Sequence, residues 1–465
     1  MTNSPHPEPS KAKKSKTSAA RQASLKTLKQ VFSGQSLSAA QVNTIDKLDD
    51  ARDRGLANEI VNGVLRWRWQ LEFFVSRLLK KPLKKKDIDV QLILLMAIYE
   101  LKDCRTPDYA VINDSVELVR KSGKKWAAGL VNAVLREFTR EQEKLISSIN
   151  DDQVRYSHPD WILKKIKKDW PQDQVYGWQK ILAANNQRPA FWLRVNQLQS
   201  NAVQYQQLLT ELEIESEVSL LADHALKLSQ GIDVRQLPGF SDGVVSVQDV
   251  GAQLAAQLLE ASADHRVLDL CAAPGGKTCH ILERTNTQDK LIAVEFDEKR
   301  MQRVIENLQR LKLSGTARDG ARAELIVADA RDYKQWWDGE AFDRILIDAP
   351  CSASGVIRRH PDIKTLRRES DIEQLVKMQS EILLSAWQML KPGGELLYVT
   401  CSIFKDENQH QIAKFLALNS NAGNDAAEIK IQADWGVACD YGRQLFPGEQ
   451  DADGFYFCKL KKTVK

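Results

Sequence analysis

The stretch VLDLCAAPGGKT, residues 267–278, decides the fold. Its first four residues form an apolar run that is typical of a strand buried on both faces. A turn of small residues and glycines follows, and the chain then continues with a helical pattern. Because a glycine-rich turn between a strand and a helix lets the backbone approach a ligand and points free N–H groups at it, we expect a ligand-binding loop here.

Four further strand-like runs follow this loop. They lie at residues 291–296, 324–329, 343–350 and 395–402, and most of them are nearly continuous apolar runs. Helical stretches separate most of the strands, and this alternation predicts a doubly wound parallel sheet. In such a sheet, ligands bind at the carboxyl ends of the strands. The run GFYFCKL, residues 454–460, predicts a late antiparallel strand.

The whole chain divides into four parts. Residues 1–18 predict a disordered basic tail, because they hold Pro, Ser and Lys with almost no large apolar residue. Residues 19–150 show apolar residues at helical spacing and no strand pattern, which predicts an all-helical bundle. Residues 151–240 combine linker helices with the strand-like FWLRVN, 191–196, and predict a small α/β domain. Residues 241–465 hold the predicted sheet, a Rossmann-like α/β domain.

The composition excludes several classes of protein. The chain has 465 residues, of which 43% are hydrophobic and 28% charged, and this excludes a mainly disordered or fibrous protein. Its longest apolar run, Leu92–Tyr99, is far shorter than the roughly 18 residues of a membrane span, and no secretory signal precedes it. Seven cysteines without a CxxC pair argue against a zinc ribbon and for a reducing compartment. We therefore expect a cytoplasmic protein with no membrane segment and no metal.

The charge is distributed unevenly along the chain. Residues 1–150 hold 27 Lys and Arg against 17 Asp and Glu, a net charge of +10, whereas residues 151–465 have a net charge of −6. A basic region on a near-neutral body suggests a polyanionic partner, most simply a nucleic acid. The alternative is an ordinary solvated surface, and charge alone does not separate the two.

The glycine-rich loop lacks the motifs of two common cofactors. A phosphate loop needs GxxxxGK[ST], but Cys271 stands where its first glycine would be, and the dinucleotide motif GxGxxG is also absent. Acidic residues end three successive strands: Glu295, which can accept hydrogen bonds from ribose hydroxyls, Asp329, which can contact an adenine amino group, and Asp348. Three carboxylates suit a neutral or cationic nucleoside, and we expect S-adenosylmethionine. The alternative for each is a helix cap or an exposed strand end.

Two cysteines follow two strand ends beside the expected cofactor. Cys351 comes after Asp348-Ala349-Pro350, and Cys401 comes after Val399-Thr400. A thiolate that adds to C6 of cytosine makes C5 nucleophilic enough to take a methyl group, and a thiolate is accessible near neutral pH. A contact between Asp348 and N3 would assist the addition. For the other cysteines we expect packing roles.

Three motifs carry a resemblance to a known family. CAAPGGKT (271–278), DAPCSASG (348–355) and TCS (400–402) resemble those of the RNA cytosine-C5 methyltransferases of the Sun/Fmu type, and the likeness extends over nearly the whole chain. Residues around 20–150 are similar to the helical RNA-binding domain of the antitermination factor NusB. The resemblance implies a NusB-like bundle, a small connecting α/β domain and a methyltransferase domain.

The resemblance also implies roles for individual residues. Cys401 is the implied nucleophile, and Cys351 is implied to assist product release. The implied cofactor contacts are Cys271, Ala272, Ala273, Pro274, Gly275, Gly276, Lys277, Glu295, Asp329 and Asp348. The family often has Asp where Glu295 stands. Spacing alone leaves the nucleophile open, because DNA cytosine methyltransferases use the cysteine of the PC motif, here Cys351.

A basic run follows the DAPCS motif directly. We expect three of its members, Arg358, Arg359 and Lys364, to contact RNA phosphates, the alternative being a solvated helix face. The resemblance implies 16S rRNA as the substrate and a monomeric enzyme. Two other functions stay open: the same chemistry on tRNA, and a non-catalytic RNA-binding assembly factor. A methyltransferase for base nitrogens or protein side chains needs no thiol and fits these motifs less well.

Overall fold

The computed structural model describes residues 17–463 except for 173–175, 286–290, 315–321 and 422–425. It divides into two compact units. The helical unit comprises Met1–Asp160 together with the short segment His360–Leu366, and the second unit comprises Trp161–Arg359 and Arg367–Lys465. Within the described residues, no helix is both long and apolar enough to cross a membrane.

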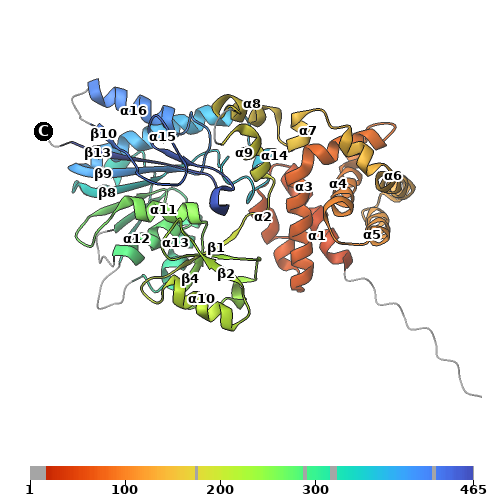
Figure 1. The fold of residues 1–465 in the computed structure, drawn as a ribbon, viewed down its shortest axis with the longest axis horizontal. Helices are drawn as coiled ribbons and strands as arrows, with labels where there is room; N and C mark the ends of the chain where they lie inside the picture. The colour runs from red at the N-terminus through yellow and green to blue at the C-terminus, as the bar shows by residue number, and fades with distance from the viewer. Residues whose placement is uncertain (1–16, 173–175, 286–290, 315–321, 422–425, 464–465) are drawn as a thin grey trace, which may run out of the picture. The chain divides into compact units, whose positions relative to one another are not determined.

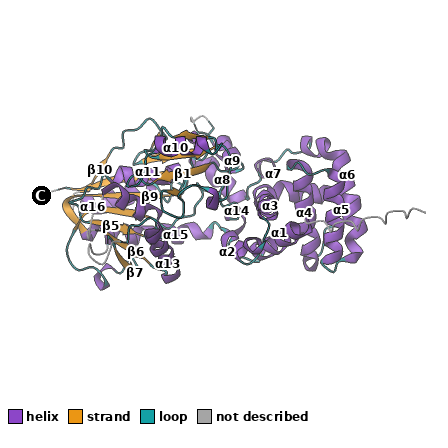
Figure 2. Ribbon diagram, turned by 90° about the horizontal axis from the view of Figure 1, so that it is seen from below, coloured by secondary structure: helices purple, strands orange, loops and turns teal. Residues whose placement is uncertain are grey.

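The helical unit is all α, as predicted, and Figures 1 and 2 show its helices without a strand among them. Its helices are α1 (Thr17–Phe32), α2 (Leu37–Val42), α3 (Ala51–Leu78), α4 (Ile88–Asp103), α5 (Asp108–Lys121), α6 (Ala128–Ser147) and α7 (Asp152–Tyr156). The apolar run Leu92–Tyr99 lies in α4 and is buried all round, because α1, α3, α5 and α6 pack around this helix.

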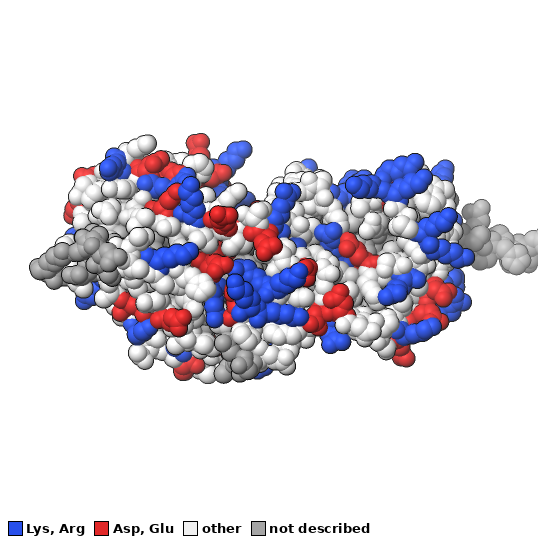
Figure 3. Space-filling view, turned by 90° about the horizontal axis from the view of Figure 1, so that it is seen from above, with Lys and Arg blue, Asp and Glu red and all other residues white. Residues whose placement is uncertain are grey.

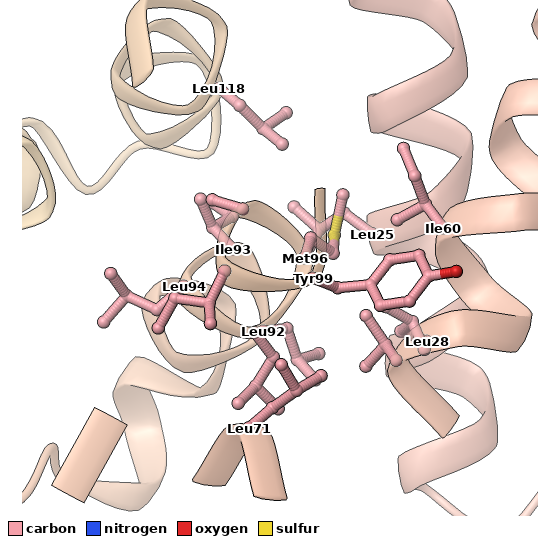
Figure 4. Packing of buried hydrophobic residues seen from close by; sticks show 14 of the residues in the cluster. Leu25, Leu28, Ile60, Leu71, Leu92, Ile93, Leu94, Met96, Tyr99 and Leu118 are labelled. Atoms are coloured by element: carbon pink, nitrogen blue, oxygen red, sulfur yellow. The ribbon is translucent and has the colours of Figure 1, made fainter. Parts of the chain in front are cut away.

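The contact of α4 with α3 requires a glycine. Figure 4 shows the Tyr99 ring of α4 beside Ile60 of α3 and Leu28 of α1. A Cβ atom on Gly63 would lie 1.9 Å from the Tyr99 ring, so only glycine lets the two helices approach this closely. The Tyr99 hydroxyl donates to Glu59 Oε1 at 2.5 Å, which satisfies the polar end of a buried aromatic residue.

The segment 360–366 is part of the helical unit although it lies between two strands of the second unit in the sequence. It holds the short helix α14 (Ile363–Leu366), and Leu366 packs against the helical core. Lys364 Nζ donates to Arg66 O at 2.6 Å and to Ser157 O at 2.7 Å. Asp362 Oδ2 accepts from the backbone N–H of Leu37 at the start of α2, at 2.9 Å. This segment was not foreseen as part of the bundle.

The second unit begins with helices and a small antiparallel sheet. The helices are α8 (Asp160–Asp169), α9 (Trp178–Asn185) and α10 (Ala202–Glu211). The strands are β1 (Phe191–Val195), β2 (Ser216–Val218), β3 (Ala225–Leu228) and β4 (Val245–Val247), in the order β2-β3-β1-β4. Leu193, Tyr205 and Leu226 are buried between α10 and this sheet. The small α/β fold predicted around FWLRVN is therefore confirmed.

The large sheet of the second unit has the order β11-β12-β13-β9-β8-β5-β6-β7, and β10 pairs with β13. Its strands are β5 (Val267–Leu270), β6 (Leu291–Glu295), β7 (Glu324–Val327), β8 (Phe342–Asp348), β9 (Leu390–Thr400), β10 (Ala426–Ile429), β11 (Val437–Ala438), β12 (Arg443–Leu445) and β13 (Phe455–Lys462). Strands β5 to β9 pair in parallel with one another, and β13 runs antiparallel to β9. The parallel core and the late antiparallel strand are as predicted.

Helices cover both faces of this sheet, which makes it doubly wound. They are α11 (Val250–Leu259), α12 (Gly276–Thr285), α13 (Glu298–Arg310), α15 (Ser370–Met389) and α16 (Gln409–Asn421). Figure 1 shows α15 and α16 above the sheet and α11, α12 and α13 below it. In the strand register Leu270 lies opposite Ile347, and Asp348 lies opposite Val399. The carboxyl ends of β5, β8 and β9 therefore meet at one edge.

Candidate active site

The loop 271–275 joins β5 to α12 and lies against β6 and α13. The N–H of Ala272 donates to Val294 O of β6 at 3.1 Å. Gly275 has a φ of 95°, and a Cβ atom there would lie 3.0 Å from the Cα atom of Val304 on α13. Both the backbone conformation and the space favour glycine. The loop is thus held at the sheet edge with α13 directly against it.

A cavity of about 460 Å³ opens at this edge, among the carboxyl ends of β5, β6, β8 and β9. Seven residues singled out from the sequence line it: Cys271, Ala273, Glu295, Asp329, Asp348, Cys351 and Cys401. The other expected cofactor residues, 272 and 274–277, are not among its lining and form the loop and the first turn of α12. The fold therefore brings the acidic residues and both cysteines into one cavity.

Among the apolar lining residues that the sequence did not single out, three have large side chains. Phe296 follows Glu295 and is 72% exposed, while Met378 and Ile382 come from α15. The sequence did carry a signal for Phe296, because a large aromatic residue directly after a strand-end carboxylate is unusual in a solvent-exposed turn and indicates a contact surface. Met378 and Ile382 are spaced i, i+4, which is also the spacing of ordinary core residues.

Two carboxylates at the ends of neighbouring strands line the cavity and differ in burial and in their hydrogen-bond partners. Glu295 is 2% exposed and accepts hydrogen bonds from the N–H of Ala273 at 3.2 Å and from Arg300 at 3.0 Å. Asp329 is more open, and the hydrogen bonds from the Arg331 side chain lower its pKa. Asp329 is therefore an ionised acceptor at neutral pH.

Asp348 is paired with a lysine from the glycine-rich loop region. Lys277 Nζ lies 2.6 Å from Asp348 Oδ2. Burial opposes the charge on Lys277, but the attraction of Asp348 outweighs it, and the pKa of the lysine is raised. A protonated amine thus lies beside the carboxylate that the sequence reasoning placed at N3 of the base.

The two thiols are in contact. The Sγ atoms of Cys351 and Cys401 lie 3.4 Å apart, and the N–H of Gly355 donates to Cys401 O at 2.9 Å. Cys351 is buried and Cys401 is partly exposed. The hydrogen bond to Cys401 and burial raise the pKa of the Cys351 thiol well above its usual value. Cys351 therefore keeps its proton and can donate a hydrogen bond to the sulfur of Cys401.

Three family models match the chain, one for each part of the fold. Residues 256–461 match "16S rRNA methyltransferase RsmB/F", residues 18–140 match the NusB family, and residues 158–235 match a ferredoxin-like domain of RsmF/B-like methyltransferases. A "Ribosomal RNA small subunit methyltransferase B" of Pseudomonas putida is 44% identical over 446 residues, 96% of this chain and 98% of that protein. The chain belongs to the RsmB/F family of 16S rRNA methyltransferases.

Another RsmB relative agrees with this assignment, and two solved structures share the fold. The protein of the same name from Vibrio cholerae is 46% identical over 415 residues, 88% of this chain and 90% of that one. The crystal structure of PH0851 has a TM-score of 0.77 at 21% identity, covering 97% of this chain and all of that one. NSun6 from Pyrococcus horikoshii, solved with SFG, has a TM-score of 0.56 at 20% identity, covering 66% and 99%. These two structures show the fold.

The basic run of this RsmB/F chain corrects an expectation. Arg358 is 1% exposed and ion-paired with Asp453, and Arg359 is paired with Asp453 and Asp249. Lys364 is also 1% exposed and is enclosed within the helical unit. Because both side chains are buried, Arg358 and Lys364 have no free face for a phosphate. Their burial could not be foreseen, because their partners lie far away in the sequence.

Charges of both signs are interspersed on the molecular surface. On the face drawn in Figure 3, Lys and Arg side chains form several separate groups with Asp and Glu side chains between them. In the helical unit, Arg52 and Lys84–Lys86 are exposed, whereas Arg66 is buried. Within the described parts of the RsmB/F chain, no group of three or more His, Cys, Asp or Glu residues could hold a metal ion.

Proposed function

We propose that this protein transfers a methyl group from S-adenosylmethionine to C5 of a cytosine in 16S rRNA, through a transient bond between Cys401 and C6. The observation that carries the proposal is the pair of thiols 3.4 Å apart in a cavity that also holds three strand-end carboxylates. A methyl transfer to nitrogen or oxygen needs no thiol, whereas transfer to C5 needs a nucleophile at C6. Family membership and the names of the relatives support rRNA as the substrate class.

The cavity fits the proposed cofactor. Asp329 is ionised and partly open. Glu295 accepts three hydrogen bonds from the protein, from Ala273 N–H, Asp297 N–H and Arg300, whereas a carboxylate offers about four acceptor positions. Cys271 and Ala273 of the glycine-rich loop line the cavity, so the backbone of this loop borders it. When bound, S-adenosylmethionine supplies the methyl group as an electrophile. The structure of NSun6 with SFG supports a ligand site in this fold.

The protein groups have separate parts in the proposed reaction. Cys401 is the more exposed thiol, and its thiolate forms the bond to C6. The Lys277–Asp348 pair holds N3 of the base, and a hydrogen bond donated to N3 from this pair stabilises the negative charge that thiolate addition builds up on the ring. After C5 has taken the methyl group, a base removes the C5 proton and the Cys401–C6 bond breaks. Cys351, which keeps its proton 3.4 Å from the leaving sulfur, donates a hydrogen bond to it and so assists release.

We also propose the domain limits 19–150, 151–240 and 241–465 and action as a monomer in the cytoplasm. The basic tail predicted at 1–18 lies outside the described residues except for residues 17 and 18, which begin α1. All seven cysteines are free, which supports a reducing compartment. The exposed Arg52 and Lys84–Lys86 support a contribution of the helical unit to RNA affinity. Cys271–Lys277, Glu295, Asp329 and Asp348 stay proposed cofactor residues.

Transfer of a radioactive methyl group from S-adenosylmethionine to 16S rRNA and to tRNA tests the proposal. We expect label in 16S rRNA and 5-methylcytidine as the only labelled nucleoside after digestion. Label in tRNA alone would contradict the substrate, and a methyl group on a nitrogen would contradict the chemistry. Binding of 16S rRNA without any transfer would favour the non-catalytic assembly factor.

A further inference from the structure

A buried carboxylate connects the two cysteine loops. Glu407 lies six residues after Cys401, just before α16, and is 0% exposed. Its Oε1 accepts from the N–H of Ser352 at 2.8 Å and from Gln379 Nε2 at 3.1 Å. Its Oε2 accepts from the hydroxyls of Ser352 and Ser402, each at 2.5 Å. Ser352 follows Cys351 directly, and Ser402 follows Cys401, so one side chain bonds the neighbours of both thiols.

We propose that Glu407 is a positioning residue that sets the separation of the Cys351 and Cys401 thiols. The effect of Glu407 on methyl transfer rests on the proposed function, but its effect on the distance between the two sulfur atoms does not. A carboxylate that receives four hydrogen bonds is fixed in place, and bonds to an ionised acceptor are stronger than those between neutral groups. Fixing the residue after each cysteine restricts the backbone that carries each Sγ atom.

Hydrogen bonds between neutral groups also connect the loops. The hydroxyls of Ser354 and Ser402 lie 3.1 Å apart, and those of Ser352 and Ser402 lie 3.2 Å apart. The N–H of Gly355 donates to Cys401 O at 2.9 Å, and the N–H of Ile403 donates to Ser354 Oγ at 3.0 Å. Both hydroxyl–hydroxyl contacts involve Ser402, which also donates to Glu407. Loss of the carboxylate therefore removes the common acceptor around which this network is arranged.

Glu407 also acts on the protonation of Cys351. The hydrogen bond to Cys401 and burial are the main causes of the raised pKa of Cys351, and the negative charge of Glu407 adds to them. A Cys351 thiol that keeps its proton is the state that the release step uses. Two substitutions separate the hydrogen bonds of Glu407 from its charge. Glu407→Gln removes the charge, but its amide oxygen still accepts from Ser352 N–H and Gln379 and its NH₂ can donate to the two hydroxyls. Glu407→Ala removes both the charge and the hydrogen bonds.

The sulfur–sulfur distance can be tested without any RNA. Diamide oxidises two adjacent thiols to a disulfide, and its N=N bond takes up the two protons and two electrons to become a hydrazine. The rate at which Cys351–Cys401 disulfide forms, measured by peptide mass spectrometry, reports how often the two sulfurs meet. We expect Glu407→Ala to slow this rate about tenfold or more, and Glu407→Gln to leave it within about threefold of the wild type.

A matched control comes from α16, the helix that follows Glu407. Gln411 of α16 is 2% exposed, and its side chain donates to Val376 O of α15 at 3.1 Å. Gln411→Ala removes a buried polar contact of α16 without touching either cysteine loop. We expect it to lower the melting temperature as Glu407→Ala does while leaving the disulfide rate unchanged. Equal slowing in both variants would show a general loosening of α16 and would contradict the proposal.

Methyl transfer gives the second readout. We expect Glu407→Ala to lower kcat about 100-fold while KM for RNA stays within about threefold, because the reacting sulfur is misplaced and the RNA surface is intact. A folded Glu407→Ala with the wild-type disulfide rate would overturn the positioning role. If Glu407→Ala does not fold, Ser402→Ala decides: a slower disulfide rate supports the proposal and an unchanged one contradicts it. A wild type that forms the disulfide but transfers no methyl group would contradict only the proposed function.

Discussion

Arg358 Nε donates a hydrogen bond to Asp453 Oδ1 over 2.6 Å, and both side chains are 1% exposed. Asp453 also pairs with Arg359, which in turn reaches Asp249 at the start of α11. These ion pairs connect the chain that follows Cys351 to the segment before β13 and to α11. The two arginines therefore hold the Cys351 loop in place.

Replacing Arg358 by alanine tests this role. The change leaves Asp453 buried with one cationic partner fewer, so we expect the free energy of unfolding to fall by about 3 kcal/mol or more. RNA affinity measured by filter binding should stay near the wild-type value wherever the variant is folded. Arg368→Ala, at an exposed neighbour, is the control and should leave stability within about 0.5 kcal/mol. A loss of RNA affinity at unchanged stability would restore Arg358 as a phosphate contact.

Gly355→Ala tests the packing of the same loop. An added Cβ would lie 2.2 Å from Gly454 O, and the backbones are already joined by a hydrogen bond from Gly454 N–H to Gly355 O at 2.8 Å. Because neither backbone can move without breaking this bond, we expect a loss of about 1–3 kcal/mol in urea unfolding, together with slower methyl transfer.

The control for this substitution is a glycine that has room for a side chain. Gly129→Ala in α6 would meet no atom within 4 Å. Because Gly129 is exposed in the first turn of α6 and has room for a methyl group, we expect this variant to stay within about 0.5 kcal/mol of the wild-type stability. Wild-type stability and activity in Gly355→Ala would show that the loop at Gly355 is not tightly packed.

The buried Asp269 of β5 predicts a pH dependence of stability. Burial raises its pKa to about 7, although Thr278 Oγ1 donates a hydrogen bond to it at 2.6 Å. Between about pH 4 and 7 the folded protein keeps the proton on Asp269, whereas the unfolded chain has lost it. The free energy of unfolding therefore falls as the pH rises through this window. We expect Asp269→Asn to gain about 2–3 kcal/mol relative to the wild type between pH 5 and pH 8.

Urea unfolding at these two pH values measures the effect of Asp269→Asn. Thr278→Val serves as the companion variant, because it removes the hydrogen bond from Asp269 and should raise the pKa of that carboxyl further. Its stability should therefore keep falling to a higher pH, so that the total loss between pH 5 and pH 8 is larger than that of the wild type. Parallel pH profiles for the wild type and Asp269→Asn would contradict a raised pKa at this residue.

Much of the fold could be predicted because its signals are local. The apolar runs that became β5, β6, β8 and β9 each carry their own strand pattern, and the rule for parallel sheets then places Asp348 and Cys401 at one edge. The burial of Arg358 could not be predicted, since its partner Asp453 lies 95 residues away. Lys364 is similar, because it bonds to the carbonyls of Arg66 and Ser157, 298 and 207 residues away. Long-range pairing of charges leaves no periodic trace in a sequence.

The sequence predicted the reacting groups of the site but not the residues that hold them in place. Strand-end carboxylates and cysteines follow from the positions of the strands, and the cavity does contain them. Glu407 was not foreseen, because a single glutamate near a helix start usually faces solvent, and only the structure shows it buried against Ser352 and Ser402.

The central claim is that Cys401 bonds to the RNA and that Cys351 assists its release. Incubation with 16S rRNA and S-adenosylmethionine, followed by denaturing gel electrophoresis, tests both parts in one measurement. The account predicts a protein–RNA adduct that accumulates in Cys351→Ala, and neither adduct nor methyl transfer in Cys401→Ala. An active Cys401→Ala, or an adduct that forms through Cys351 in its absence, would contradict it.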